Sequence, residues 1–365
     1  ALGVASYRQL MLGYQVAGGE YGILRRYGNI RLAQLAGICS VLAGFAVPAA
    51  LSLQILARQF VDGWGLAAEY LPWVAAGLLV ALGGLARNGH GARYLCLGLG
   101  LLILTALALL LASAVSLLPF TISAPGSAFA AAPEPVHLVQ LPLFLAFAFS
   151  GFNALIYLPE VDRLDLGRRV SAMRWGAAVA VALIVLTNVL ALRLAPVSLQ
   201  QGADAILALA TQLPALGVVV QWLWLGCLLG TAVVSMLLAP GVLKAMRGRA
   251  TGQRKVDLPI FVSITAVLAV IPLPASILAA GGFFLLVCSS ACIALTLRAP
   301  SVSLGFTAWW ERYAPRCFIG ANLLVLLALC WQRPSVLLIT GLLILFAGAS
   351  SVFRPVPCPI ETAER

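Results

Sequence analysis

The residues with the clearest chemical potential lie in the apolar run 141–160, LPLFLAFAFSGFNALIYLPE. The middle of this run contains Ser150, Gly151 and Asn153. Glycine costs about 1 kcal/mol relative to alanine inside a helix. Serine and asparagine side chains compete for the backbone hydrogen bonds that hold a helix together. The pattern therefore predicts an interrupted helix, at mid-membrane depth if the run crosses a bilayer.

A break at that depth exposes backbone N–H and C=O groups that lipid cannot satisfy, so it must face a cavity or packed protein. In membrane transporters such a cavity holds the substrate. The free N–H groups and the positive end of a half-helix then receive a carboxylate. A close helix crossing through Ser150-Gly151 is an equally good explanation. The residues alone leave both explanations open.

Other signs of chemistry are few. No Lys, Arg, Asp or Glu lies in the middle of an apolar span, which argues against a carboxylate proton relay or a buried ion pair holding a substrate. His90 and His137, the only histidines, fall in expected loops. The sequence contains no Gly-Lys pair for a P-loop, no HExxH and no Cys-x-x-Cys. We therefore expect neither an enzyme nor a metal or cofactor site, apart from a coupling ion, proton or sodium, of unknown identity.

The elements that must position these residues are membrane helices. The chain has 365 residues, of which 62% are hydrophobic and 10% charged, and its mean hydropathy is +1.02. A soluble domain has about 45–50% apolar and about 25% charged residues. So small a share of charged residues could not cover the surface of a soluble protein of this size. The net charge of +11 is explained by basic cytoplasmic loops, and nucleic acid is not an expected partner.

Ten apolar runs approach or reach the length of about 20 residues that a membrane span requires. They lie at 31–57, 69–86, 94–119, 141–158, 171–195, 214–239, 258–273, 275–297, 317–331 and 335–353. The stretch 1–13 is predicted to be the end of a further helix, which gives about 11 membrane helices. It lacks the features of a signal peptide, so we expect the chain to begin partway through a membrane protein.

The basic residues divide sharply between alternate loops. Twenty of the 23 Lys and Arg residues fall in one set, and only Arg58, Arg193 and Arg333 fall in the other. Since cytoplasmic loops carry the excess of basic residues, we expect the C-terminus and a mobile basic loop at 244–257 to be cytoplasmic. The loop at 120–138 is expected outside. The predicted location is the inner or plasma membrane.

Two segments resemble a known transporter family. The run FAFSGFNALIYLPEVDRLDLGRRV looks like the sixth helix and following loop of the amino acid–polyamine–organocation (APC) superfamily. The run SYRQLMLGYQVAGGEYGILRRYGN is similar to the second helix and first cytoplasmic loop of that family, with residues 17–21 as its most specific piece. About 120 residues and three spans separate the two motifs, as in the family. The resemblance covers nearly the whole chain.

The resemblance implies an all-α, LeuT-like inverted-repeat fold of five plus five helices with two additional C-terminal helices. The counterpart of the family's Gly-rich first helix is absent. The 365 residues would form a single polytopic membrane domain. Its expected parts are the remainder of the first repeat at 1–119, an outer loop at 120–140, the second repeat at 141–297, and two extra helices with a cytoplasmic tail at 298–365.

The implied function is secondary active transport of an amino acid by alternating access around a broken helix at 147–153. The implied substrate-binding residues are Phe147, Ser150, Gly151, Asn153 and Ser235. Thr231 and Ser235 are weak candidates for ion binding, and Gly18, Gly19 and Glu160 are candidates for a cytoplasmic gate. Since a charged side chain would lack compensation in this uncharged site, we expect a neutral, apolar substrate. Import and export are both compatible with the sequence.

Several alternatives accompany these expectations. Gly18-Gly19 favours a flexible turn that could serve as the hinge of a gate, or a tight loop beside a basic, phospholipid-facing anchor at Arg25-Arg26. Gly226 and Gly230 form a face that favours helix packing over a site. A non-transporting scaffold or receptor derived from a truncated permease is the main alternative function, and a membrane-embedded enzyme is the second. The expected partners are the substrate and the lipid bilayer; the sequence does not indicate an oligomeric state.

Overall fold

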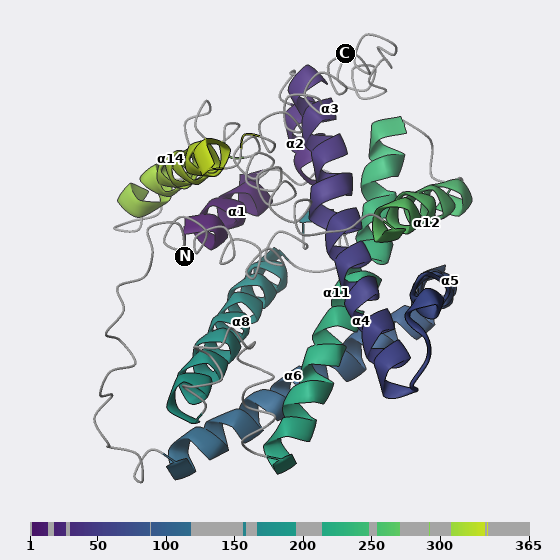
Figure 1. Cartoon of the computed structure of the whole chain (residues 1–365). Coiled ribbons are helices and arrows are strands. Elements are labelled where there is room, and N and C mark those ends of the chain that lie inside the picture. Colours follow the sequence, from purple (N-terminus) through teal and green to yellow (C-terminus); the bar gives the residue numbers. More distant parts are fainter. Residues whose placement is uncertain are drawn as a thin grey trace. The chain divides into compact units, whose positions relative to one another are not determined.

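The structure of the chain is a computed structural model in which every described element is helical (Figure 1). It describes residues 2–13, 18–26, 30–87, 89–117, 156–157, 166–194, 214–247, 254–270, 292, 308–332 and 334. No strand occurs within these ranges. The helices are α1 (Leu2–Gly13), α2 (Gly19–Arg26), α3 (Ile30–Cys39), η1 (Ser40–Ala46), α4 (Val47–Gly63), η2 (Ala68–Tyr70), α5 (Leu71–Arg87), α6 (Gly89–Leu117), α8 (Leu166–Leu194), α11 (Pro214–Arg247), α12 (Arg254–Val270) and α14 (Ala308–Gln332).

Seven of the ten predicted spans coincide with helices. The matching elements are α3–η1–α4, α5, α6, α8, α11, α12 and α14. The prediction of a helix at 1–13 is confirmed by α1. Nearly all of the other three predicted spans, at 141–158, 275–297 and 335–353, lies outside the described residues.

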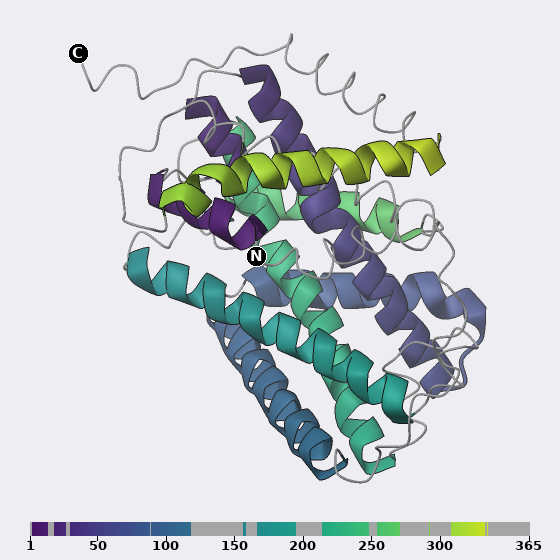
Figure 2. The ribbon, with the colours of Figure 1, turned by 90° about the vertical axis from the view of Figure 1, so that its left-hand side faces the viewer.

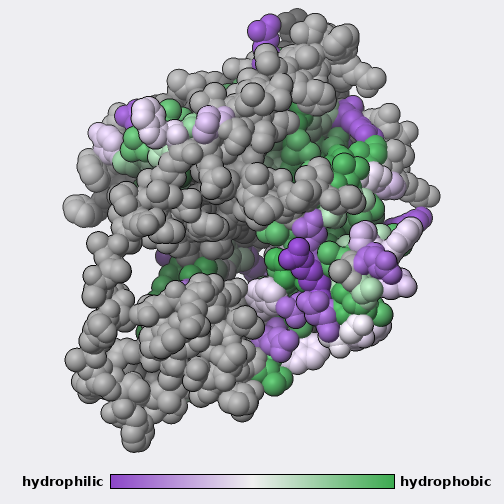
Figure 3. Space-filling model, viewed as in Figure 1, coloured by the Kyte–Doolittle hydropathy of each residue, from purple (hydrophilic) through white to green (hydrophobic). Residues whose placement is uncertain are grey.

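Among the residues that the structure describes, three helical stretches are long and apolar enough to cross a membrane: Ile30–Gly63, Gly167–Leu190 and Gln221–Arg247. Many large hydrophobic side chains are exposed on the described helices, among them Val80 and Leu324. Figure 3 shows such hydrophobic residues, in green, on the surface. Apolar side chains on the outside of long helices suit contact with lipid, so the chain is a helical membrane protein.

The chain divides into two compact units. Unit 1 consists of residues 1–51, 136–174 and 234–365, and unit 2 of residues 52–135 and 175–233. In unit 1, α1 lies beside α14, α2 packs on α3, and α12 contacts η1 (Figures 1 and 2). In unit 2, α5 contacts α6 and η2.

Small residues bring α11 close to α6 within unit 2. A Cβ added at Gly226 would lie 2.7 Å from Leu102 Cδ2, and one at Gly230 would lie 3.4 Å from Leu99 Cδ1. The two glycines therefore form a shallow face that receives leucine side chains. This contact agrees with the packing interpretation of the Gly-xxx-Gly pattern.

A π-helical segment, η1, lies inside the long apolar stretch Ile30–Gly63. Its wide turn is visible in the hydrogen bond from the Val47 N–H to the Leu42 carbonyl, five residues back. The next residue is Pro48, which has no N–H to donate and whose ring would clash with the carbonyl four residues earlier. The wider turn accommodates the proline without ending the helix. Such segments often mark functional sites, and η1 contributes directly to the site described next.

Candidate functional site

The turn at Gly18 and Gly19, in unit 1, is tightly packed. Both residues have a left-handed backbone, with φ of +95° and +60°. A Cβ at Gly18 would lie 2.6 Å from the Cβ of Ala245 on α11, and a Cβ at Gly19 would overlap the ring of Tyr157. Both the backbone conformation and the space therefore require glycine. The structure matches the tight-loop explanation of this pair, because the turn is buried and closely packed rather than open.

Tyr157 connects this turn to the π-helical segment. Its ring packs edge-on against Phe45, with centroids 5.0 Å apart and an interplanar angle of 80°. Its hydroxyl donates a hydrogen bond of 3.2 Å to Ser40 Oγ. Both partners belong to η1. The ring of Tyr157 thus lies between Gly19 and the irregular part of the long apolar helix.

Glu20, immediately after the turn, is a buried acidic residue that sequence reasoning missed. The Tyr7 hydroxyl on α1 donates to Glu20 Oε1 at 2.7 Å, and both side chains are fully buried. Hydrogen bonds to a carboxylate are among the stronger ones in proteins. Its position between the predicted helix at 1–13 and the predicted span at 31–57 gave no sign of this burial. No local pattern indicates this burial, because it depends on contacts with other parts of the chain.

Two more polar side chains lie near Glu20. Cys292 is buried and lies near Ser6 and Glu20. The Ser6 hydroxyl donates to the Leu2 carbonyl at 2.9 Å. Ser6, Tyr7, Glu20 and Cys292 together are called the Glu20 cluster. It joins three parts of the chain that are distant in sequence.

A second buried acidic group lies where α11 and α12 meet the basic segment 244–257. Arg247 Nη1 lies 3.1 Å from Asp257 Oδ1, and the two side chains are 28% and 2% exposed. The prediction of a mobile loop over the whole of 244–257 is wrong at both ends, because α11 continues to Arg247 and α12 begins at Arg254. Apolar counting ended the spans too early, since the last and first helical turns are polar.

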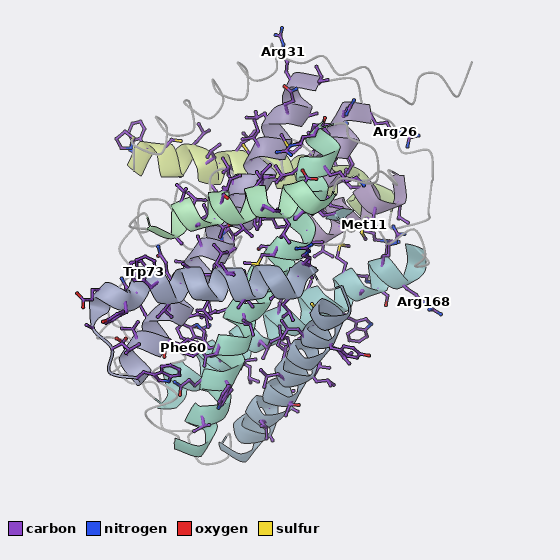
Figure 4. All side chains as sticks on the ribbon, turned by 90° about the vertical axis from the view of Figure 1, so that its right-hand side faces the viewer. Met11, Arg26, Arg31, Phe60, Trp73 and Arg168 are labelled. Atoms are coloured by element: carbon purple, nitrogen blue, oxygen red, sulfur yellow. The ribbon has the colours of Figure 1, made fainter. Side chains whose placement is uncertain are left out.

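Basic side chains gather near the end of α2. Arg25 Nη1 donates to the Tyr21 hydroxyl at 3.2 Å, and its guanidinium lies over the same ring, 5.9 Å from the centroid. Arg26 and Arg31 are exposed and project outward at the same end of the molecule in Figure 4. Exposed arginines next to apolar helices suit contact with phospholipid headgroups, as the anchor explanation of this segment requires.

The predicted substrate residues are only partly covered by the structure. Phe147, Ser150, Gly151 and Asn153 lie outside the described residues, as does Glu160 of the predicted gate. Ser235 is buried on α11, in unit 1. Thr231, one turn earlier, is exposed, and its hydroxyl donates to the Cys227 carbonyl at 2.8 Å. The substrate site at the helix break therefore stays a prediction.

The described residues do not bring together three or more His, Cys, Asp or Glu side chains that could hold a metal ion. No protein-family model matches the chain, and no curated protein matches it significantly. Membership of the transporter superfamily is therefore a proposal that depends on the residues of this chain and on their contacts.

Proposed function

We propose that the protein is a secondary active transporter of neutral, apolar amino acids, similar to members of the APC superfamily. Its substrate site is the helix break at 147–153, and transport occurs by alternating access around it. The proposed fold has about 11 membrane helices in a five-plus-five inverted repeat with two extra helices. The proposed location is the inner or plasma membrane with a cytoplasmic C-terminus.

One contact carries the proposal. The resemblance comes from two segments that are far apart in sequence, one containing Gly18-Gly19-Glu20 and the other ending beyond Tyr157. The ring of Tyr157 packs on Gly19 so closely that any side chain there would overlap it. Two segments chosen for their separate likeness to one family are thus neighbours in unit 1. Chance resemblance of two unrelated segments gives no reason for them to meet.

Two further observations support a site in this unit. Ser235, proposed to face the substrate, is buried on α11. The π-helical segment η1, which contacts Tyr157, is a type of irregular helix that is frequent at functional sites. The uncharged residues at 147–153 favour a substrate whose amino and carboxylate groups are held by helix ends and whose side chain is apolar.

The test is substrate flux through the full-length protein in proteoliposomes. Vesicles preloaded with unlabelled leucine should accumulate radiolabelled leucine by exchange, while labelled lysine and glutamate should not accumulate in vesicles loaded with the same compound. Protein-free vesicles give the background. The absence of exchange for every amino acid tested, with protein that remains folded, would contradict transport and favour the scaffold or receptor alternative.

A further inference from the structure

The turn between α4 and α5, in unit 2, displays four large aromatic side chains. Phe60, Trp64, Tyr70 and Trp73 are all exposed, and the two tryptophans are 74% and 76% exposed. Figure 4 shows Phe60 and Trp73 on the left of the view, one from α4 and the other from α5. Residues 60–73 are called the aromatic turn.

The aromatic turn has a defined backbone. The Leu66 N–H donates to the Val61 carbonyl at 2.9 Å, and the Gly65 N–H donates to the Asp62 carbonyl at 3.3 Å. With Gly65 at φ +63°, these two bonds form the Schellman motif that ends many helices. The short helix η2 then leads directly into α5. The exposure of the tryptophans is therefore a property of an ordered turn.

The aromatic side chains also contact one another. The rings of Phe60 and Trp64 meet edge to face, with centroids 5.9 Å apart and an interplanar angle of 83°. In water, the apolar surface of each exposed ring would stay unburied. Removing that surface from water would stabilise the protein by about 25 cal/mol per Å². Tryptophan and tyrosine combine an apolar ring with a polar hydrogen-bonding group, and both are enriched where bilayer and water meet.

The position of the turn along its helix selects the lipid interface as the partner. The apolar stretch Ile30–Gly63 has 34 residues and ends where the turn begins. At about 1.5 Å per residue it is about 51 Å long. The hydrocarbon core of a bilayer is about 30 Å thick, and about 40–45 Å with its headgroup regions. A helix longer than the hydrocarbon core ends at an interface, where the aromatic turn follows it.

The charges around the turn fit a zwitterionic surface. Arg58, Asp62 and Glu69 are exposed in or next to it, so both signs are present. An anionic surface would be matched by basic residues alone, as at the Arg26 and Arg31 end of the molecule.

We propose that the aromatic turn is an interfacial anchor, which inserts the indole rings of Trp64 and Trp73 among phospholipid headgroups. Because α4 ends and α5 begins in this turn, the anchor sets their depth and limits the tilt that such a long apolar helix would otherwise adopt. The anchor requires membrane insertion but not transport, so its test is independent of the test of the proposed function.

The test places the two indoles relative to the bilayer in the full-length protein. The protein is labelled with 5-fluorotryptophan and reconstituted in phosphatidylcholine nanodiscs. Fluorine NMR signals are assigned by the loss of one resonance in Trp64→Phe and one in Trp73→Phe. If either phenylalanine variant fails to fold, Trp64→Tyr or Trp73→Tyr gives the same assignment. Line broadening is then compared for a headgroup-attached nitroxide, a nitroxide at the end of an acyl chain, and a gadolinium chelate in water.

The anchor predicts that both resonances are lost with the headgroup nitroxide, weakened less by the acyl-chain nitroxide, and weakened least by the aqueous chelate. Stronger broadening by the aqueous chelate would place the turn in water and overturn the proposal. Insensitivity to all three probes would show that another protein surface, such as a second copy of the chain, covers the rings, which would also overturn it. Strongest broadening by the acyl-chain probe would place the rings too deep for an anchor.

Discussion

The Tyr7 hydroxyl and the Glu20 carboxylate form a hydrogen bond of 2.7 Å between two fully buried side chains. The bond joins α1 to α2 just beyond the Gly18-Gly19 turn. Bonds to charged groups contribute about 1.5–3 kcal/mol, and leaving the acceptor buried without its donor adds a desolvation penalty. The pair therefore holds the first two helices of unit 1 together.

Tyr7→Phe removes the donor and keeps the ring. We expect it to lower the free energy of unfolding by about 1.5–3 kcal/mol, seen as a lower melting temperature in detergent. Tyr94→Phe is the matched control, because Tyr94 is 75% exposed on α6. In a double-mutant cycle, Tyr7→Phe and Glu20→Gln should not be additive. Equal melting temperatures for the Tyr7 and Tyr94 variants would show that the bond contributes nothing to stability.

Gly19→Ala tests the contact on which the family proposal depends. The added methyl group would overlap the Tyr157 ring in a backbone of φ +60°. Gly65→Ala is an unusually close control, since Gly65 has φ +63° and nothing within 4 Å of its added Cβ. Strain in the left-handed region costs each variant about 1–2 kcal/mol, so any excess loss in Gly19→Ala measures the overlap. We expect a clear excess in thermal unfolding, and the same loss in both variants would argue against the close approach of Tyr157.

The Arg247–Asp257 pair should respond asymmetrically to substitution. Arg247→Gln leaves a buried carboxylate without its nearest cation, whereas Asp257→Asn removes the buried charge itself. We expect Arg247→Gln to lower the melting temperature more than Asp257→Asn. The double variant should resemble Asp257→Asn, because no buried charge remains. A larger loss for Asp257→Asn would mean that the carboxylate has other compensation.

The distribution of basic residues predicts which loops share a side of the membrane. Thr251→Cys in the basic segment should be labelled from the cytoplasmic side, and Ser127→Cys in the segment 120–138 from the opposite side. A membrane-impermeant maleimide applied to intact cells and to inverted vesicles measures this. Both variants carry Cys358→Ser, and the Cys358→Ser protein alone gives the background. Labelling of both positions from one side would contradict the predicted order of spans.

The positions of the long helices could be predicted from the sequence because each needs a long run of apolar residues. Helix ends could not, because the first and last turns are polar, as at Lys244–Arg247 and Arg254–Asp257. Hydropathy also gave no sign of the π-helical segment, although Pro48 was a reason to expect an irregular turn near it. Hydropathy averages over an apolar run and does not register the backbone N–H that a proline lacks.

In the candidate site, the turn could be predicted from the sequence but the buried acidic residue could not. Gly18-Gly19 indicated a turn, and the turn is there. The burial of Glu20 was missed because its place between two spans suggested a solvated loop. Its full burial and its hydrogen bond with Tyr7 on α1 show that it is inside. Tertiary contacts of this kind leave no periodic pattern in a single sequence.

The most direct measurement compares Gly151→Leu, at the proposed helix break, with Gly176→Leu on α8, where an added Cβ meets nothing within 4 Å. Leucine exchange and the melting temperature are measured on the same purified proteins. A side chain at the break would block the backbone groups that hold the substrate carboxylate, while leucine suits both a helix and lipid. The proposal predicts that Gly151→Leu loses exchange but keeps its melting temperature, and that Gly176→Leu keeps both. Loss of stability together with exchange in Gly151→Leu alone, as a close helix crossing would produce, would contradict a substrate site at this position.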